Sequence, residues 1–404
     1  MKDEILEGLN SEQAKAVSQT EGPVLIVAGA GSGKTRVLTC RIANILDKGV
    51  KPSGVLSLTF TKKAASEMKE RVAAMVGARV ARGVVMGTFH SVFIRFLRDY
   101  AEFLGYPKQF TVYDQSDSTA MVKTCLKELN LDDKVYKPKT VLGRISEAKN
   151  NLASPAAYIA NSVAVEHDRN CKMPRLAEVY DLYWRKCREA GVMDFDDILF
   201  EMNILLRDNT DALEEISSRF SHILVDEYQD TNRAQYIILK KLAAKHRNIC
   251  VVGDDSQSIY AFRGAKIENI LNFKRDYPDC KTFRLEQNYR STKTIVDAAN
   301  SLIAHNESRI PKTCFSMGDE GEQIRLIKSY TEQEEALCIV SEIIDRMRTA
   351  RAQYEDFAIL YRTNAQSRAL EEQLRRRSIP PAAAPHDGRP YRSWKRPRPF
   401  QSRH

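Results

Sequence analysis

V-L-I-V-A-G-A-G-S-G-K-T, residues 24 to 35, is the stretch from which the predicted fold of this chain follows. Its apolar first half has the length of a buried strand, its glycines mark a tight turn, and the apolar spacing that begins at Val37 is that of a helix. Further strands alternate with helices downstream, which favours an α/β fold with a parallel sheet.

The glycine-rich loop in this stretch has the chemistry of a phosphate site. Gly29, Gly31 and Gly33 let the backbone turn its N–H groups toward an anion at the start of a helix. Lys34 adds a cation, and the hydroxyl of Thr35 is a ligand for Mg²⁺. The strict phosphate-loop pattern G-x-x-x-x-G-K-T fails at its first glycine, which is Ala28 here. Because the strand, the loop and G-K-T are all in place, we still expect a nucleoside triphosphate as the ligand.

Composition sets bounds on the class of protein. The 404 residues suffice for two or three domains. The net charge is +9, but the stretch 380–404 carries +5 of it, so basicity alone is weak support for a nucleic-acid partner. The eight cysteines are scattered, without the spacing of a metal site, and no apolar run is long enough to cross a bilayer. We expect a reduced, cytoplasmic protein without a membrane partner.

A second motif, I-L-V-D-E-Y-Q-D at residues 223–230, places two adjacent carboxylates at the end of an apolar strand. Downstream of a phosphate loop, such a pair predicts that Asp226 holds Mg²⁺. Glu227 is then expected to orient and deprotonate the water that attacks the γ-phosphate.

Three further strand ends predict contacts with single-stranded nucleic acid, because aromatic rings stack on bases and polar groups contact the backbone. The first is T-F-T at 59–61, and the second is G-T-F-H at 87–90. The third follows the strand I-C-V-V-G-D at 249–254, where Gln257 is expected to reach phosphate while Tyr260, Phe262 and Arg263 offer aromatic and cationic surface. An ordinary aromatic core remains the alternative for each.

The segment Q-N-Y-R-S-T at residues 287–292 predicts the edge of a nucleotide site. Tyr289 has a ring that can stack on a base, and Arg290 can bind phosphate through two hydrogen bonds. Strands at 323–329 and 356–361 and helices at 332–349 and 365–377 are then expected as the start of a second α/β domain. After Pro380 the pattern breaks into a Pro- and Arg-rich stretch, which we expect to be disordered or miscoded.

Together these motifs, from about Leu9 to Pro380, resemble those of the UvrD/PcrA/Rep family of superfamily 1 DNA helicases. The resemblance implies two RecA-like domains that bind ATP and Mg²⁺ and move 3′ to 5′ along single-stranded DNA in DNA repair or replication, with single-stranded DNA and duplex junctions as partners. The expected fold class is therefore α/β, with a P-loop (RecA-like) parallel sheet, a helical insertion and an incomplete second RecA-like domain. The expected domains are 1–90 with 191–283, the insertion 91–190, the second domain 284–379 and the tail 380–404.

The resemblance also implies a role for each matching residue. Gln13 would contact adenine, Tyr289 would stack on the base, and Lys34 and Gln257 would contact the terminal phosphates. Thr35 and Asp226 would hold Mg²⁺, Glu227 would orient the attacking water, and Arg290 would reach the γ-phosphate. The loop implied to surround the cofactor comprises Ala28, Gly29, Ala30, Gly31, Ser32, Gly33, Lys34, Thr35 and Arg36. The implied DNA contacts are Phe60, Thr88, His90, Phe195, Tyr260, Phe262 and Arg263, with Phe262 at a position where the family usually has Trp.

The chain departs from the family after Pro380, where the remaining helicase motifs are missing from the sequence. We therefore expect a truncated form in which unwinding is impaired. Two alternatives stay open: a non-motor module that binds ATP and DNA, and a P-loop ATPase that acts on other substrates. The T-F-T and T-F-H strand ends argue against the second alternative.

Overall fold

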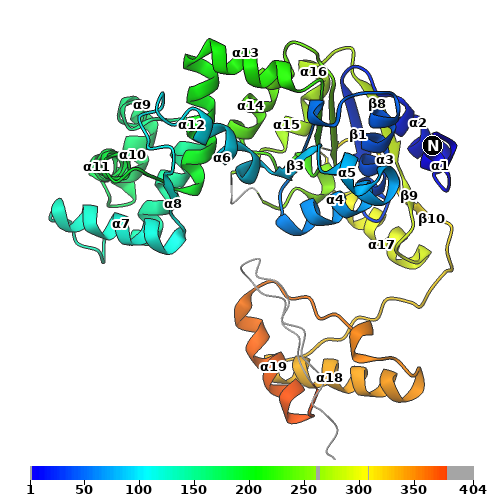
Figure 1. The fold of residues 1–404 in the computed structure, drawn as a ribbon. Helices are drawn as coiled ribbons and strands as arrows, with labels where there is room; N and C mark the ends of the chain where they lie inside the picture. Colours follow the sequence, from blue (N-terminus) through cyan, green and yellow to red (C-terminus); the bar gives the residue numbers. More distant parts are fainter. Residues whose placement is uncertain (1, 261–263, 308, 380–404) are drawn as a thin grey trace, which may run out of the picture. The chain divides into compact units, whose positions relative to one another are not determined.

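The computed structural model describes residues 2–260, 264–307 and 309–379 (Figure 1). By their internal contacts they form two compact units, which divide between Glu322 and Gln323. Phe262 and Arg263, two of the predicted DNA contacts, and the stretch 380–404 lie outside the described residues. In the part of the chain that the structure describes, no helix is long and apolar enough to span a bilayer.

The first unit is organised around a parallel sheet of six strands in the order β3-β2-β6-β7-β1-β8. Every neighbouring pair in this sheet runs parallel, so the carboxyl ends of the strands lie along one edge. The sheet confirms the predicted fold class, and an edge of this kind is where α/β proteins bind ligands. The strands are β1 (Val24–Ala28), β2 (Val55–Thr59), β3 (Val85–Thr88), β6 (His222–Val225), β7 (Ile249–Gly253) and β8 (Lys281–Leu285).

Helices cover both faces of this sheet, because alternate residues of each strand point to opposite sides. Val24 and Ile26 of β1 belong to one buried cluster, whereas Leu25 and Val27 belong to another. The first cluster is covered by α1 (Lys2–Leu6), α2 (Ser11–Ser18), α3 (Lys34–Asp47), α4 (Lys62–Val76) and α5 (Ala78–Ala81). The second is covered by α6 (Phe89–Asp99), α12 (Phe195–Asp208), α13 (Thr210–Arg219), α14 (Arg233–Ala243), α15 (Glu268–Leu271) and α16 (Phe273–Asp276).

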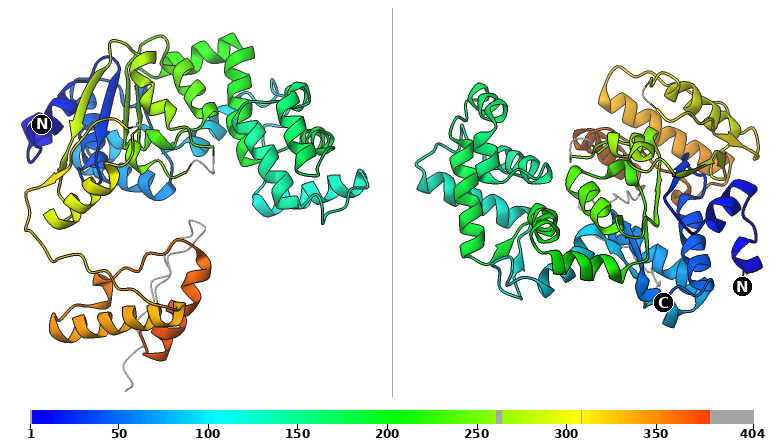
Figure 2. Two further views of the ribbon diagram at one scale, coloured as in Figure 1. Left: turned by 180° about the vertical axis from the view of Figure 1, so that it is seen from behind. Right: turned by 90° about the horizontal axis from the view of Figure 1, so that it is seen from above.

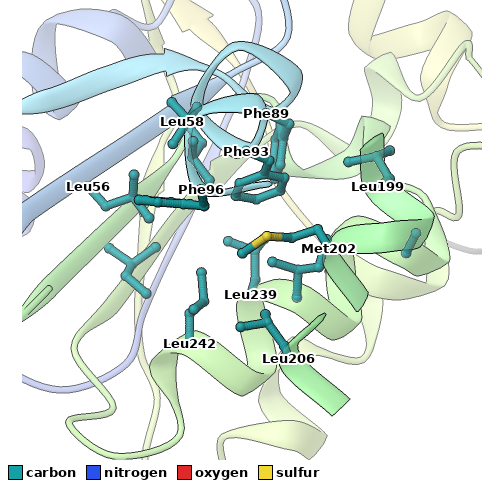
Figure 3. Close-up of a cluster of buried hydrophobic side chains, with 14 of the residues drawn as sticks. Leu56, Leu58, Phe89, Phe93, Phe96, Leu199, Met202, Leu206, Leu239 and Leu242 are labelled. Carbon is teal, nitrogen blue, oxygen red and sulfur yellow. The ribbon is translucent and has the colours of Figure 1, made fainter. Parts of the chain in front are cut away.

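Figure 3 shows the second cluster at its centre, where leucines of β2 meet side chains of three helices. Phe89, Phe93 and Phe96 lie on one face of α6, and Met202 of α12 and Leu239 of α14 complete the packing. Burying side chains of this size contributes roughly 1.5–3 kcal/mol each. The start of α6, which carries one of the predicted DNA motifs, is therefore held rigidly against the sheet.

A helical lobe stands beside the sheet in all three views (Figures 1 and 2). It has its own buried cluster, which includes Val122, Ile145, Tyr180 and Tyr183. The short parallel strands β4 (Thr111–Val112) and β5 (Val192–Met193) pair where the chain enters and leaves the lobe. Its helices are α7 (Gln115–Glu128), α8 (Pro138–Asn150), α9 (Pro155–Ala160), α10 (Ser162–Asn170) and α11 (Leu176–Glu189).

The segment after β8 stays against the first unit. Strand β9 (Gln287–Asn288) pairs in parallel with β10 (Phe315–Ser316), and helix α17 (Lys293–Ile303) lies between them in the sequence. Single-turn 3₁₀ helices at Pro52–Gly54, Tyr228–Asp230 and Asp255–Gln257 complete this unit, and the last two directly follow β6 and β7.

The second unit is helical in its described residues, 323–379. Helices α18 (Glu332–Thr349) and α19 (Ser367–Arg376) confirm the two predicted helices, and 3₁₀ turns lie at Tyr354–Asp356 and Asn364–Gln366. The strands predicted at 323–329 and 356–361 are wrong, because these residues form no strand. A strand needs a neighbour for its backbone groups, and no strand is present in this unit's described residues; Leu326 is 84% exposed and Leu360 94%.

Candidate active site and nucleic-acid surface

The glycine-rich loop leaves backbone donors free at the start of α3. Gly31 and Gly33 have φ angles of 68° and 81°, a region that side chains disfavour, and the Ser32 hydroxyl closes the turn on the Gly29 carbonyl at 2.7 Å. Among the described residues, no acceptor is bound by the N–H groups of Gly31, Gly33, Lys34 and Thr35. Free N–H groups at the start of a long helix fit a phosphate group.

Alanine at position 28 fits this loop as well as glycine would. Ala28 is the last residue of β1 and pairs with Leu285 in the sheet, so its backbone is extended. An extended position places no demand for glycine. The departure from the strict phosphate-loop pattern is therefore without structural consequence.

Asn288 supports the loop from β9, and the sequence analysis did not single it out. Its Nδ2 donates to the Ala30 carbonyl at 2.8 Å, while its Oδ1 accepts from the N–H groups of Arg290 and Ser291 at 2.7 and 2.8 Å. A Cβ at Gly31 would lie 2.8 Å from that Nδ2, so only glycine fits there. An Asn side chain that accepts from the backbone N–H two residues later forms an Asx turn, and the tendency of Asn to form such turns was the available clue.

Gln13 and Tyr289 are held close to the loop through Asn10. The Gln13 Nε2 donates to the Ser32 carbonyl at 2.9 Å, and its Oε1 accepts from the Asn10 N–H at 3.0 Å. The Asn10 Nδ2 donates to the Tyr289 hydroxyl at 2.9 Å. Gln13 thus braces the loop, and its predicted contact with adenine stays a prediction. Arg36 donates to the Glu7 carbonyl at 3.3 Å, and its predicted contact with the cofactor also stays a prediction.

One of the two carboxylates at the end of β6 pairs with the lysine of the loop. The Lys34 Nζ lies 3.2 Å from the Glu227 Oε2, so residues 193 positions apart form one ion pair. Glu227 has a φ of 49°, a strained angle for a non-glycine residue, which turns its side chain toward the loop. Burial, reinforced by the charge of Glu227, raises the pKa of Asp226 to about 6.

The donor set around Asp226 fits a divalent cation that is shared with a ligand. Asp226 is buried at the strand end, and Thr35 lies in the first turn of α3. In the described part of the chain, no group of three or more His, Cys, Asp or Glu side chains could hold a metal ion. A cation bound by Thr35 and Asp226 would therefore take its remaining ligands from phosphate oxygens and water, as Mg²⁺ commonly does.

Gln257 and Arg290 complete the set of residues predicted to be catalytic. Gln257 follows β7, and its Nε2 donates to the Asp254 Oδ2 at 2.6 Å. Arg290 lies beside the loop, because a Cβ added to Gly31 would be 2.9 Å from the Cβ of Arg290. Its guanidinium pairs with no carboxylate among the described residues, which leaves that cation available to an anionic ligand.

Gln229 joins the ends of β6 and β7, and the sequence analysis did not single it out. Its Nε2 donates to the Glu227 Oε2 at 2.9 Å, and its Oε1 accepts from the Asp254 N–H at 3.0 Å. Gln229 is buried and lies in the same D-E-Y-Q-D motif as the carboxylates. A buried amide bonded on both sides fixes the distance between the two strand ends.

The predicted DNA residues Thr88, His90 and Phe195 lie at the start of α6 and α12. The rings of His90 and Phe195 meet edge to face at 5.7 Å, and Phe195 is 53% exposed. Phe60 packs on Phe89, the residue before His90, at 5.5 Å. The Thr88 hydroxyl caps α6 by accepting from the Ser91 N–H at 3.2 Å, and its predicted contact with DNA stays a prediction. Tyr260 follows β7 and is 40% exposed.

A buried ion cluster fixes Phe195 at the first turn of α12. The Lys149 Nζ of α8 lies 2.7 Å from both Asp194 Oδ2 and Asp197 Oδ1. The same two aspartates form the capping box of α12, and Phe195 lies between them in the sequence. Removing one member of such a cluster leaves an uncompensated buried charge, so the position of the ring depends on the helical lobe.

Two models of known protein families match this chain. The model of the UvrD/REP helicase N-terminal domain matches residues 9–278. The chain belongs to the UvrD/REP helicase family. A second model, of the UvrD-like helicase C-terminal domain, matches residues 283–384. The family predicted from the order of the motifs is thereby confirmed.

Curated members of the UvrD/REP helicase family align with most of the chain. The ATP-dependent DNA helicase PcrA of Leuconostoc citreum is 46% identical over 374 residues, which cover 92% of this chain and 49% of that relative. The ATP-dependent DNA helicase PcrA of Staphylococcus aureus strain Mu50 is 47% identical over 377 residues, which cover 93% and 50%. The chain spans about half the length of the curated relatives it matches.

We expect His90 to make the stability of this member of the UvrD/REP helicase family depend on acidity. Burial lowers its pKa to about 4, against a smaller opposing effect of a hydrogen bond with the Phe195 backbone. Below about pH 6.5 the His90 ring binds a proton in the unfolded chain but stays neutral in the folded chain. Stability is therefore lost as the pH falls from about 6.5 to about 4.

We expect His90→Gln to reduce this acid sensitivity by about 2 kcal/mol over that window, less than the full shift implies because the ring is partly exposed. Urea unfolding of both proteins at pH 7 and pH 4.5 measures it. An equal loss of stability in both proteins would show that His90 does not titrate in this way.

Proposed function

We propose that this chain is the ATP-hydrolysing part of a DNA helicase that moves 3′ to 5′ along single-stranded DNA. The observation that carries the proposal is the Lys34–Glu227 ion pair, at 3.2 Å, which joins the phosphate loop to the end of β6. The names of the curated relatives, ATP-dependent DNA helicase PcrA, support the same activity.

In the proposed reaction, the phosphates of ATP take the place of Glu227 as the partner of Lys34. Glu227 is then free to orient the attacking water and to accept its proton. Gln257 and Arg290 contact the terminal phosphate, while Tyr289 stacks on the base beside Gln13. Thr35 and Asp226 would hold Mg²⁺, which would neutralise part of the phosphate charge.

Single-stranded DNA is proposed to cross the carboxyl edge of the sheet, near the His90–Phe195 pair and Tyr260. Exposed rings suit bases of any sequence, because every base has a face on which a ring can stack. Phe60, Phe262 and Arg263 are proposed to belong to the same track. We also propose duplex junctions as partners, a cytoplasmic location, a role in DNA repair or replication, and the domain boundaries expected from the sequence.

A second candidate is an ATP- and DNA-binding module that does not unwind duplexes. It is favoured by one observation: residues 323–379 form no strand, and their apolar side chains at Leu326 and Leu360 are largely exposed. Closing a nucleotide site during turnover requires rigid elements on both sides of the ligand. We therefore propose weak unwinding by the 404-residue chain itself.

The test is ATP hydrolysis by the purified chain with and without oligo(dT), together with displacement of a strand from duplexes that carry a 3′ or a 5′ tail. We expect hydrolysis that oligo(dT) stimulates, and little displacement from either duplex. Hydrolysis that DNA does not affect would contradict the proposed function. Robust displacement from the 3′-tailed duplex would instead overturn the proposal of weak unwinding.

A further inference from the structure

A lysine from the segment after α17 is buried between two aspartates at the end of β7. The Lys312 Nζ lies 2.9 Å from the Asp254 Oδ1, 2.6 Å from the Asp255 Oδ1 and 3.0 Å from the Ser256 Oγ. Its side chain is only 6% exposed, and both aspartate side chains are buried more deeply. Lys312 itself lies outside every motif that the sequence analysis singled out, whereas Asp254 ends the strand motif at 249–254.

The segment that carries Lys312 touches the nucleotide site at two more points. The Ile310 N–H donates to the Asp255 Oδ2 at 3.0 Å, which adds a backbone contact to the ion pair. On the other side of Lys312, the Cys314 Sγ occupies the space that a Cβ at Gly29 would need. Residues 310–314 therefore contact both the end of β7 and the phosphate loop.

Asp254 connects Lys312 to the proposed catalytic residues. One of its carboxylate oxygens binds Lys312, and the other accepts from the Gln257 Nε2 at 2.6 Å. Its N–H donates to Gln229, whose amide in turn donates to Glu227. A continuous series of bonds thus runs from Lys312 to the carboxylate that pairs with Lys34.

The charge on Lys312 decides how Asp254 can bind Gln257. In the structure the Asp254 Oδ1 binds both Lys312 and the Ser256 N–H, which leaves Oδ2 as the acceptor for the Gln257 amide. Without it, two buried carboxylates lie side by side with no cation between them, an arrangement that costs several kcal/mol in proteins. Asp254 would then draw other donors, and the Gln257 amide would lose its fixed orientation.

We propose that Lys312 is a positioning residue for Gln257, so that ATP hydrolysis depends on the packing of residues 310–314 against β7. The inference rests on the proposed function, because it assigns Lys312 a part in that reaction. It predicts a defect in kcat rather than in nucleotide affinity. It also predicts that the defect requires Gln257.

The experiment is a double-mutant cycle on ATP hydrolysis with Lys312→Met and Gln257→Ala. We expect Lys312→Met to lower kcat on the order of tenfold, with nucleotide Kd changed less than twofold. In the Gln257→Ala background, adding Lys312→Met should change kcat less than twofold. Lys240→Met is the control, since it removes an exposed ion pair with Asp276 of similar length, 3.1 Å, and should leave kcat unchanged.

Each outcome of the double-mutant cycle supports or contradicts the role of Lys312. Equal fold-losses from Lys312→Met with and without Gln257 would overturn the inference, as would an unchanged kcat in the single variant. Should Lys312→Met not fold, Lys312→Met with Asp255→Asn removes one buried negative charge as well, and the same Gln257-dependent loss is expected. Hydrolysis by the wild type but not by Lys34→Ala would uphold the proposed function whatever Lys312 does, whereas an inactive wild type would overturn both.

Discussion

Glu227→Gln is expected to lower kcat for ATP hydrolysis by on the order of 10²–10⁴-fold, because the amide cannot accept the proton of the attacking water. Its shape is nearly unchanged, so it can still receive the hydrogen bond that Gln229 now donates at 2.9 Å. Nucleotide affinity should stay within about threefold of the wild type, or rise, since ATP no longer displaces an ion pair between Lys34 and a carboxylate.

Lys34→Ala should fail in a different way. It removes the cation of the phosphate loop, so we expect nucleotide affinity itself to fall, by at least tenfold for a lost charge-assisted contact of about 1.5–3 kcal/mol. Fluorescent-nucleotide titration together with steady-state hydrolysis separates the two variants. Equal losses of nucleotide affinity in both would show that Lys34 and Glu227 do not have the distinct roles proposed here.

Tyr260→Ala and Phe195→Ala are each expected to weaken binding of oligo(dT) by about 5- to 150-fold at fixed salt, since a stacked base contributes roughly 1–3 kcal/mol. Both side chains are substantially exposed, Phe195 at the start of α12 and Tyr260 in the segment that follows β7. The affinity of every variant should also fall as salt rises, because backbone contacts release counterions. Fluorescence anisotropy with a labelled oligonucleotide measures both effects.

Phe103→Ala is the matched control for these variants. Phe103 is 50% exposed, close to the exposure of Phe195, but it follows the end of α6 whereas His90 lies in the first turn of that helix. We expect it to bind oligo(dT) as the wild type does. Silent substitutions at Tyr260 and Phe195, or equal affinity for duplex and single-stranded DNA, would mean that the track lies elsewhere on the molecule.

The sequence alone was enough to predict the parts of the site that depend on local structure. The strand, loop and helix from Val24 onward and the carboxylates after Val225 lie within short stretches whose apolar spacing and glycines determine their conformation. Because parallel strands share one carboxyl edge, the sequence also predicted that Lys34 and Glu227 belong to one site. The ion pair between them agrees with that expectation.

Tertiary structure alone decided the contacts between segments that are distant in the sequence. The bond from Asn288 to the phosphate loop and the bonds from Lys312 to the end of β7 each join partners well removed along the chain, and no local pattern predicts either contact. The strands expected at 323–329 and 356–361 failed for the complementary reason. Their apolar residues suit a strand, but a strand forms only where another is available to accept and donate its backbone hydrogen bonds, and pairing of that kind is a property of the whole fold.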